Sequence, residues 1–191
     1  MPIDRVEPLS LPDVQLITPK RFGDGRGTFA ETYKASDFEA HGLPTVWLQD
    51  NMSYTADRGV FRGLHYQAPP HAQGKLVTVL SGAIMDVAVD LRADSPTFGQ
   101  ACTVELSEEN GRQVYVPRGF AHGFLTLTPH VRVHYKADRE YAPASEGGLP
   151  WNDPDLGVQL PDLGVPVQTS DKDAHWEPWA SFKTPFVDGR L

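Results

Sequence analysis

The sequence is poor in several features that define common protein classes. A single cysteine, Cys102, stands among its 191 residues, so no disulfide can form within the chain. The first ten residues, MPIDRVEPLS, do not resemble a signal peptide, and no apolar run is long enough for a membrane helix. Positive charge is also scarce, because 17 Lys and Arg face 25 Asp and Glu, a net charge of -8. We therefore expect a cytoplasmic protein with no membrane partner and no nucleic-acid partner.

Helical signals are sparse, whereas strand signals run through most of the chain. The 17 glycines and 17 prolines are spread along the sequence, as expected for short strands joined by turns. The segments SDKDAHWEP (170–178) and KASDFEAHG (34–42) are the two that favour helix. The triplet SGA (81–83) is expected to split one strand segment into a hairpin. Alternating or β-branched runs predict strands over 14–19, 45–55, 75–92, 100–107, 112–117 and 130–137.

Strands at this spacing predict a single all-β domain over residues 1–191, folded as a jelly-roll barrel. Two spacings are typical of the cupin barrel, one from Gly59 to Gly82 and one around VPRGFAH (116–122). From residue 143 onward we expect a loop-rich C-terminal arm. Metal-binding cupins take four ligands from these motifs, but only His65 and His122 are present. Two imidazoles alone are a poor ligand set, so we expect no catalytic metal.

Several polar side chains stand inside strand segments, where apolar residues would be expected. In FRGLHYQ (61–67), a regular strand would place His65 and Gln67 on one face and Arg62 on the other. In MDVAVD (85–90), Asp86 and Asp90 share a face. A carboxylate inside a barrel needs a partner such as Arg or His. His65 and Gln67 would point together into the barrel or together out of it.

His65 is the strongest candidate for a general base. A neutral imidazole, with a pKa near 6.5, can accept a proton at neutral pH. A carboxylate usually holds the other ring nitrogen of such a base, and Asp171 or Asp173 could do so. The alternative is a core histidine bound to a backbone carbonyl. Arg62 and Lys75 nearby favour a site, because an ordinary core does not collect cations.

Long motifs along the chain resemble one known family. They are DGRGTFAE, LQDNMSYTADRGVFRGLHYQAPPHAQGKLV, GAIMDVAVDLRADSPTFG, VYVPRGFAHGFL, YKADREYAP and SDKDA. In this order they resemble the motifs of the dTDP-4-dehydrorhamnose 3,5-epimerase family, from about residue 14 to about residue 175. The resemblance implies a metal-free cupin that needs no cofactor, is usually a homodimer, and acts on dTDP-linked 4-keto-6-deoxy sugars.

The resemblance also implies a catalytic set. His65 would be the base, Asp173 its carboxylate partner, Tyr135 the acid on the opposite face, and Lys75 the cation that stabilises an enolate. Without the family, Tyr135 could equally be a core aromatic residue, and Lys75 could be a solvated strand end.

A second set of residues falls on family positions that contact substrate. Arg26 and Arg62 would clamp the diphosphate, because guanidinium groups match phosphate oxygens. Phe22 and Phe29 would sandwich the thymine or wall the pocket, or would pack in the core. His122 would lie near the sugar, in a binding or a structural role. The other positions in this set are Glu31, Gln49, Asn51 and Tyr141.

The expected reaction is epimerisation at C3 and C5 of a dTDP-4-keto-6-deoxyhexose. Relatives that invert only C3 or only C5 would need the same base, tyrosine and lysine, so a single-centre epimerase is the alternative. Two further classes are a metal-dependent cupin enzyme and a sugar-binding cupin without catalysis.

Overall fold

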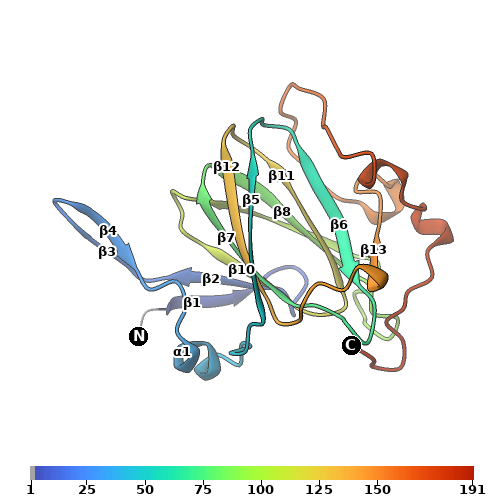
Figure 1. The fold of residues 1–191 in the computed structure, drawn as a ribbon, viewed down its shortest axis with the longest axis horizontal. Helices are drawn as coiled ribbons and strands as arrows, with labels where there is room; N and C mark the ends of the chain where they lie inside the picture. Colours follow the sequence, from blue (N-terminus) through green and yellow to red (C-terminus); the bar gives the residue numbers. More distant parts are fainter. Residues whose placement is uncertain (1–2) are drawn as a thin grey trace.

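The computed structural model describes residues 3–191, and strands dominate it (Figure 1). The helical segments are α1 (Ala35–Ala40) and the 3-10 turns η1 (Pro143–Ser145), η2 (Pro154–Leu156), η3 (Asp173–His175) and η4 (Trp179–Ser181). The strands are β1 (Ile3–Pro8), β2 (Gln15–Pro19), β3 (Arg21–Asp24), β4 (Gly27–Ala30), β5 (Gln49–Thr55), β6 (Phe61–Gln67), β7 (Lys75–Ser81), β8 (Ala83–Asp90), β9 (Ala101–Ser107), β10 (Gln113–Val116), β11 (Phe120–Thr126), β12 (Val131–Ala137) and β13 (Glu146–Gly148).

Two antiparallel sheets form the barrel. The strand order is β1-β2-β10-β7-β12-β5 in one sheet and β13-β6-β11-β8-β9 in the other. Alternate residues of both sheets point into a shared core, which includes Val77, Leu106, Val114, Phe124 and Val133. The prediction of an all-β cupin jelly roll with short helices and a loop-rich C-terminal arm is confirmed.

The prediction of a hairpin at SGA (81–83) is wrong. β7 pairs with β10 and β12, whereas β8 pairs with β9 and β11, so the chain changes sheets at Gly82. Gly82 has a φ of 77°, and a Cβ atom there would lie 2.5 Å from Thr128 Oγ1. A tight corner therefore connects the sheets. Local alternation identified the two strands but carried no information about their distant partners.

Strand β6 is irregular, and this irregularity shapes the site. In its pairing with β11, His65 lies opposite His122 and Arg62 lies opposite Phe124. The two β6 residues are three positions apart in the chain, whereas their partners on β11 are only two positions apart. The extra residue lies in the segment that contains Gly63, whose φ is 116°. A Cβ atom on Gly63 would lie 2.7 Å from the His122 carbonyl oxygen, so only glycine fits there. The bulge brings Arg62 and His65 to one cavity, which corrects the expectation of opposite faces.

The C-terminal arm lies against the outside of the five-stranded sheet (Figure 1). Val60 bridges to Gln168, and the Phe61 amide donates to the Gln168 carbonyl at 2.8 Å. Further along, Phe186 is buried in the cluster behind that sheet. This route places η3, with Asp173 at its start, over strand β6. The helix predicted over 34–42 is α1, whereas the segment near 170–178 forms only the single turn η3.

A two-stranded hairpin, β3–β4, projects from the barrel (Figure 1). This hairpin and the strands β1, β11 and β13 lie outside the segments predicted as strands from the sequence. No helix within residues 3–191 combines the length and apolar character needed to cross a membrane.

Candidate active site

A cavity of about 200 Å³ opens inside the barrel. It lies between strands of both sheets, and its walls carry a high share of polar and charged side chains. These side chains are Ser53 from β5, Arg62 and His65 from β6, Lys75 from β7, His122 from β11 and Tyr135 from β12. Three of the four residues predicted to be catalytic therefore share one cavity.

The fourth, Asp173, reaches His65 from the C-terminal arm. Its Oδ1 lies 2.6 Å from His65 Nε2, and its Oδ2 accepts the Gly63 amide at 3.2 Å. Burial alone would raise the pKa of Asp173, but the hydrogen bond from His65 and the backbone amide bring it below its ordinary value. An ionised Asp173 holds the proton of His65 on Nε2. Nδ1 is then the ring nitrogen that can accept a proton from a ligand.

Lys75 begins β7 and presents its side chain to the same cavity. Burial lowers the pKa of its ammonium group to about 8, while the charges of Asp86 and Glu146 act in the opposite direction. None of the ion pairs among residues 3–191 includes Lys75. Its charge is thus available to a negative group on a ligand.

Tyr135 lines the cavity from β12. Burial raises the pKa of its phenol, Glu146 raises it further, and Arg62 lowers it. The hydroxyl therefore keeps its proton at neutral pH and can donate it to a developing carbanion.

Arg62 and His122 complete the polar wall. Arg62 Nε donates to Thr55 Oγ1 at 3.0 Å, which fixes the guanidinium group at the cavity. His122 Nε2 lies 2.8 Å from Asp86 Oδ2, and both residues are buried. The structure thus contains a second imidazole–carboxylate pair directly across the strands from His65. A neighbouring hollow of about 330 Å³ shares Arg62 and His65 and adds Lys172 to its lining.

Three predicted substrate-binding residues form a connected group. Gln49 Nε2 donates to Asn51 Oδ1 at 2.8 Å, and the Tyr141 amide donates to Gln49 Oε1 at 2.8 Å. Tyr141 Oη donates to Glu146 Oε2 at 2.7 Å, and Lys172 Nζ lies 2.6 Å from the same oxygen. This chain of contacts links β5 and β13 to the arm that carries Asp173.

Sequence reasoning missed four residues at or beside the cavity. Ser53 lines it, and its Oγ is buried with no hydrogen-bond partner in residues 3–191. Asp86 was placed on one strand face with Asp90, but no specific partner or role was predicted for it. Glu146 and Lys172 were not singled out, although Lys172 directly precedes Asp173 in the quoted segment SDKD. The position of Lys172 next to Asp173 could have identified it as a residue near the site.

Of the nine predicted substrate-binding residues, only Arg62 and His122 line the cavity around His65. Gln49, Asn51 and Tyr141 form the group described above, and the other four lie on or just after the projecting hairpin. Phe22 and Phe29 face each other across the projecting hairpin and are 51% and 67% exposed. Arg26, between them, pairs with Asp24 at 2.6 Å. Glu31 follows the hairpin, half-buried, and none of these four side chains lines the cavity around His65.

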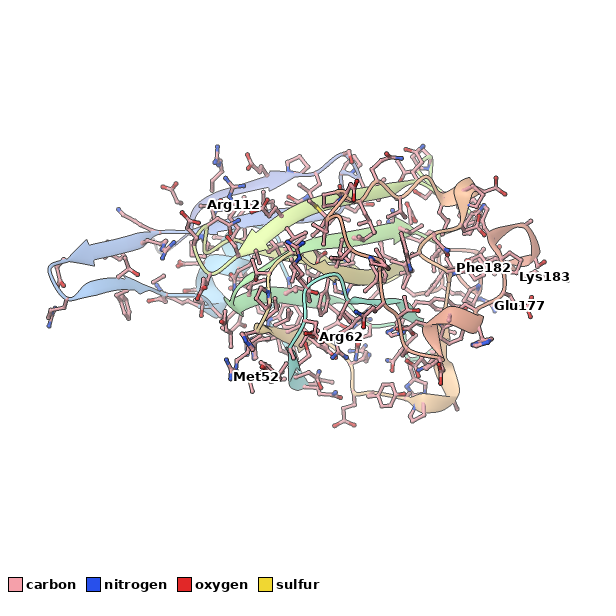
Figure 2. The ribbon with its side chains drawn as sticks, turned by 90° about the horizontal axis from the view of Figure 1, so that it is seen from above. Met52, Arg62, Arg112, Glu177, Phe182 and Lys183 are labelled. Atoms are coloured by element: carbon pink, nitrogen blue, oxygen red, sulfur yellow. The ribbon has the colours of Figure 1, made fainter. Side chains whose placement is uncertain are left out.

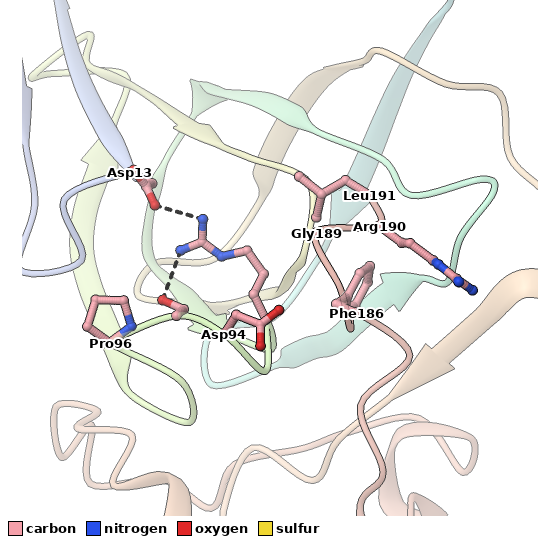
Figure 3. Close-up of a pocket in the computed structure, with 9 residues that line it drawn as sticks. Asp13, Asp94, Pro96, Phe186, Gly189, Arg190 and Leu191 are labelled. Carbon is pink, nitrogen blue, oxygen red and sulfur yellow. Dashed lines mark hydrogen bonds and ion pairs between the residues drawn. The ribbon is translucent and has the colours of Figure 1, made fainter.

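A separate cavity of about 350 Å³ lies beside the C-terminal residues 186–191 (Figure 3). The guanidinium group of Arg92, which lines this cavity, forms ion pairs with the carboxylates of Asp13 and Asp90, each with an N···O distance of 2.7 Å. This arrangement is structural, because the guanidinium group already has two carboxylate partners. In the described part of the chain, no three His, Cys, Asp or Glu side chains are grouped so that they could hold a metal ion.

Comparisons with known proteins agree with this geometry. The family model described as dTDP-4-dehydrorhamnose 3,5-epimerase matches residues 8–181. The chain belongs to the dTDP-4-dehydrorhamnose 3,5-epimerase family. The family member of this name from Salmonella typhimurium is 48% identical over 86% of this chain and 90% of its own length.

A solved structure from Legionella pneumophila, in complex with dTDP-4-keto-L-rhamnose, is 43% identical. It covers 94% of both chains with a TM-score of 0.88, so this family member shares both fold and topology with it. Another relative, the dTDP-4-dehydrorhamnose 3-epimerase from Streptomyces niveus, is 38% identical over 89% of this chain and 82% of its own length. The family thus includes relatives named for one centre as well as for two.

Proposed function

We propose that this nucleotide-sugar epimerase converts dTDP-4-dehydro-6-deoxyglucose to dTDP-4-dehydrorhamnose by inverting C3 and C5. The observation that carries the proposal is the shared cavity, in which a carboxylate-held imidazole, a phenol and an ammonium group surround one space. Those three groups are what proton transfer next to a ketone requires. The Legionella structure, whose ligand is dTDP-4-keto-L-rhamnose, supports the substrate class.

In the proposed mechanism, His65 Nδ1 removes the proton from the carbon beside the C4 ketone. The electron pair of that C–H bond moves to the carbonyl oxygen and forms an enolate. Lys75 stabilises the negative oxygen, which is more negative in the transition state than in the ketone. Tyr135 then donates its proton to the opposite face of the carbon, which restores the ketone and inverts the centre. His65 releases its proton and Tyr135 regains one before the next cycle.

The remaining residues of the site are proposed to hold the nucleotide sugar. Arg62 and Lys172 line one hollow beside His65 and would bind the diphosphate, although the whole protein carries a net negative charge. Gln49, Asn51 and Tyr141, already connected by hydrogen bonds, would contact the nucleotide, and His122 would contact the sugar. A 3-epimerase of the same substrate is the second candidate, because the Streptomyces niveus relative carries that name.

Incubation with dTDP-4-keto-6-deoxyglucose in deuterium oxide tests the function. Proton NMR should show loss of the C3 and C5 hydrogen signals and appearance of the inverted sugar. Exchange at C3 alone would establish the 3-epimerase instead. Absence of exchange at both carbons would contradict catalysis altogether and leave a binding protein.

Tyr135→Phe should separate the two halves of the reaction. Because His65 and Lys75 remain, the enolate still forms, and the C–H hydrogens still exchange with deuterium from the solvent. Net inversion should be lost, since no acid stands on the opposite face. The same NMR experiment reports both signals, and undiminished inversion would exclude Tyr135 as the acid.

We also propose a homodimer in which the hairpin β3–β4 completes the site of the partner subunit. The hairpin projects from the barrel with exposed aromatic side chains that have no role in their own chain's cavity (Figure 1). The outer face of β5 and β7 adds exposed apolar side chains, Met52, Tyr54 and Leu80. Met52 lies at the outer margin of the molecule in Figure 2. Such a patch is typical of an interface.

Mixed subunits test the exchange of hairpins. Subunits with Arg26→Ala and subunits with His65→Asn should each be weakly active when alone, at substrate concentrations below KM. When they are mixed and reassociated, half of the dimers combine both subunits, and each contains one intact site. About a quarter of wild-type activity should then return. No recovery in a mixture whose subunit exchange is verified would show that Arg26 serves its own chain.

A cytoplasmic location, and the absence of nucleic-acid and membrane partners, remain part of the proposal. The net charge of -8 supports the second point, because it opposes binding to phosphate backbones. We also propose that residues 1–191 act as one catalytic domain, since the arm supplies Asp173 to a barrel that supplies His65.

A further inference from the structure

Asp86 is a buried carboxylate that the steps above do not use. It lies on β8, in the five-stranded sheet, and is 1% exposed. Its Oδ2 is 2.8 Å from His122 Nε2, and His122 lines the cavity. A carboxylate at this depth is costly unless opposite charge compensates it.

The charges around the barrel are unequally paired. Lys75 is a cation in the cavity with no carboxylate within 4.0 Å in the described residues, and it approaches from the opposite sheet. Asp86 has only His122, which can be neutral. Among the other buried carboxylates of the described residues, Asp37, Asp90 and Asp138 each pair with a lysine or an arginine, whereas Asp173, like Asp86, pairs with an imidazole.

We propose that Asp86, held in place by His122, is a positioning residue whose charge keeps Lys75 in the ammonium form. The two charges compensate each other without direct contact, because no ion pair within 4.0 Å joins Lys75 to Asp86. The gap between them leaves the Lys75 ammonium free to meet the enolate oxygen. A direct ion pair would fix the ammonium to Asp86 and weaken its interaction with the substrate.

Electrostatics support this role. Burial drives the pKa of Lys75 down to about 8, and Asp86 is the larger of the two carboxylate influences that oppose burial. Glu146, from β13, is the other. Arg62 and His65 on β6, His122 on β11 and Tyr135 on β12 also face the cavity, and none of them adds a negative charge at neutral pH. Without Asp86, the pKa of Lys75 should fall further.

Asp86→Asn removes the charge and keeps a side chain that can hydrogen-bond to His122. In protein labelled with ¹³C at lysine Cε, the Lys75 signal is identified by its absence in Lys75→Met. Its titration midpoint should move from about 8 downward by on the order of one unit in Asp86→Asn. Asp162→Asn is the matched control, because it makes the same change at an exposed side chain, which accepts the Gly164 N–H, and should leave the midpoint unchanged.

The kinetic consequence rests on the proposed function and is measured separately. With the midpoint one unit lower, kcat at pH 8 should fall about fivefold, because the ammonium fraction falls from about a half to about a tenth. At pH 6, kcat should be close to that of the wild type, and KM should change little at either pH. A loss that is equal at all pH values would indicate a merely structural role and would contradict the proposal.

The NMR titration decides the inference even if the protein fails to epimerise the substrate, so the two failures are distinguishable. An unchanged Lys75 midpoint in folded Asp86→Asn would overturn the proposal. If that variant does not fold, Asp86→Ser removes the same charge with a smaller side chain, and the same criterion applies. Asp86→Glu should restore a midpoint near that of the wild type.

Discussion

His65→Asn is expected to lower kcat by roughly 10² to 10⁴-fold. The asparagine amide can still hydrogen-bond to Asp173, but it cannot take a proton from carbon. Deuterium exchange should therefore disappear at both C3 and C5, because one base serves both centres. Stopped incubations in deuterium oxide, followed by proton NMR, measure exchange and inversion together.

The appropriate control for this variant is His41→Asn, which makes the same change at an exposed residue after α1. It should leave exchange and inversion unchanged. Binding of dTDP to His65→Asn, measured by calorimetry, should also be close to that of the wild type. Exchange that persists in His65→Asn at even one of the two carbons would mean that another group acts as base there.

Lys75→Met should lower kcat by about 10² to 10³-fold, the loss usually seen when one group that stabilises an oxyanion is removed. Methionine has a similar length and no charge, so the cavity stays filled while the enolate loses its cation. The loss should be equal at C3 and C5, since both enolates place negative charge on the same C4 oxygen. KM should change less than kcat, because the charge on that oxygen develops only as the reaction proceeds.

Lys183→Met is the matched control, because Lys183 is exposed on the C-terminal arm (Figure 2). It should retain wild-type kcat. Separate rates for the two carbons come from the decay of their individual proton signals. A Lys75→Met enzyme with full exchange would show that another group stabilises the enolate, and Arg62 is the other Lys or Arg side chain in the cavity lining.

The sequence was most informative where polar, potentially catalytic residues stand in segments with the alternating pattern of a strand. His65, Lys75 and Tyr135 stand in strand segments whose alternation was readable, and all three face one cavity. Because they stand inside predicted strands, they could be distinguished from ordinary surface charges on the basis of the sequence. Asp173 could be named because its segment resembles a family motif, although 108 residues separate it from His65.

The pairing of strands that are far apart in the chain could not be predicted from local sequence patterns. The SGA triplet looks like a hairpin turn, yet the strands on either side join different sheets, because each finds its partners far away in the chain. The bulge in β6 likewise depends on its pairing with β11, so regular alternation misplaced Arg62. Alternation placed Asp86 and Asp90 on one face of their strand, but the contact of Asp86 with His122 depends on the pairing of β8 with β11.

The projecting hairpin shows a different limit. The family resemblance predicts that its residues Phe22, Arg26 and Phe29 bind the substrate. The structure places them away from the cavity of their own chain, and in the proposed homodimer they would act in the site of the partner subunit. An interface of this kind leaves little local signature in the sequence of a single subunit.

The origin of Asp173 in the arm has a consequence for biosynthesis. The segment that carries Asp173 follows β1 through β12 in the chain, so it is synthesised after the strands that supply His65, Lys75 and Tyr135. If His65 is the base, as proposed, its ring gains the carboxylate that orients it only after η3 has docked over β6.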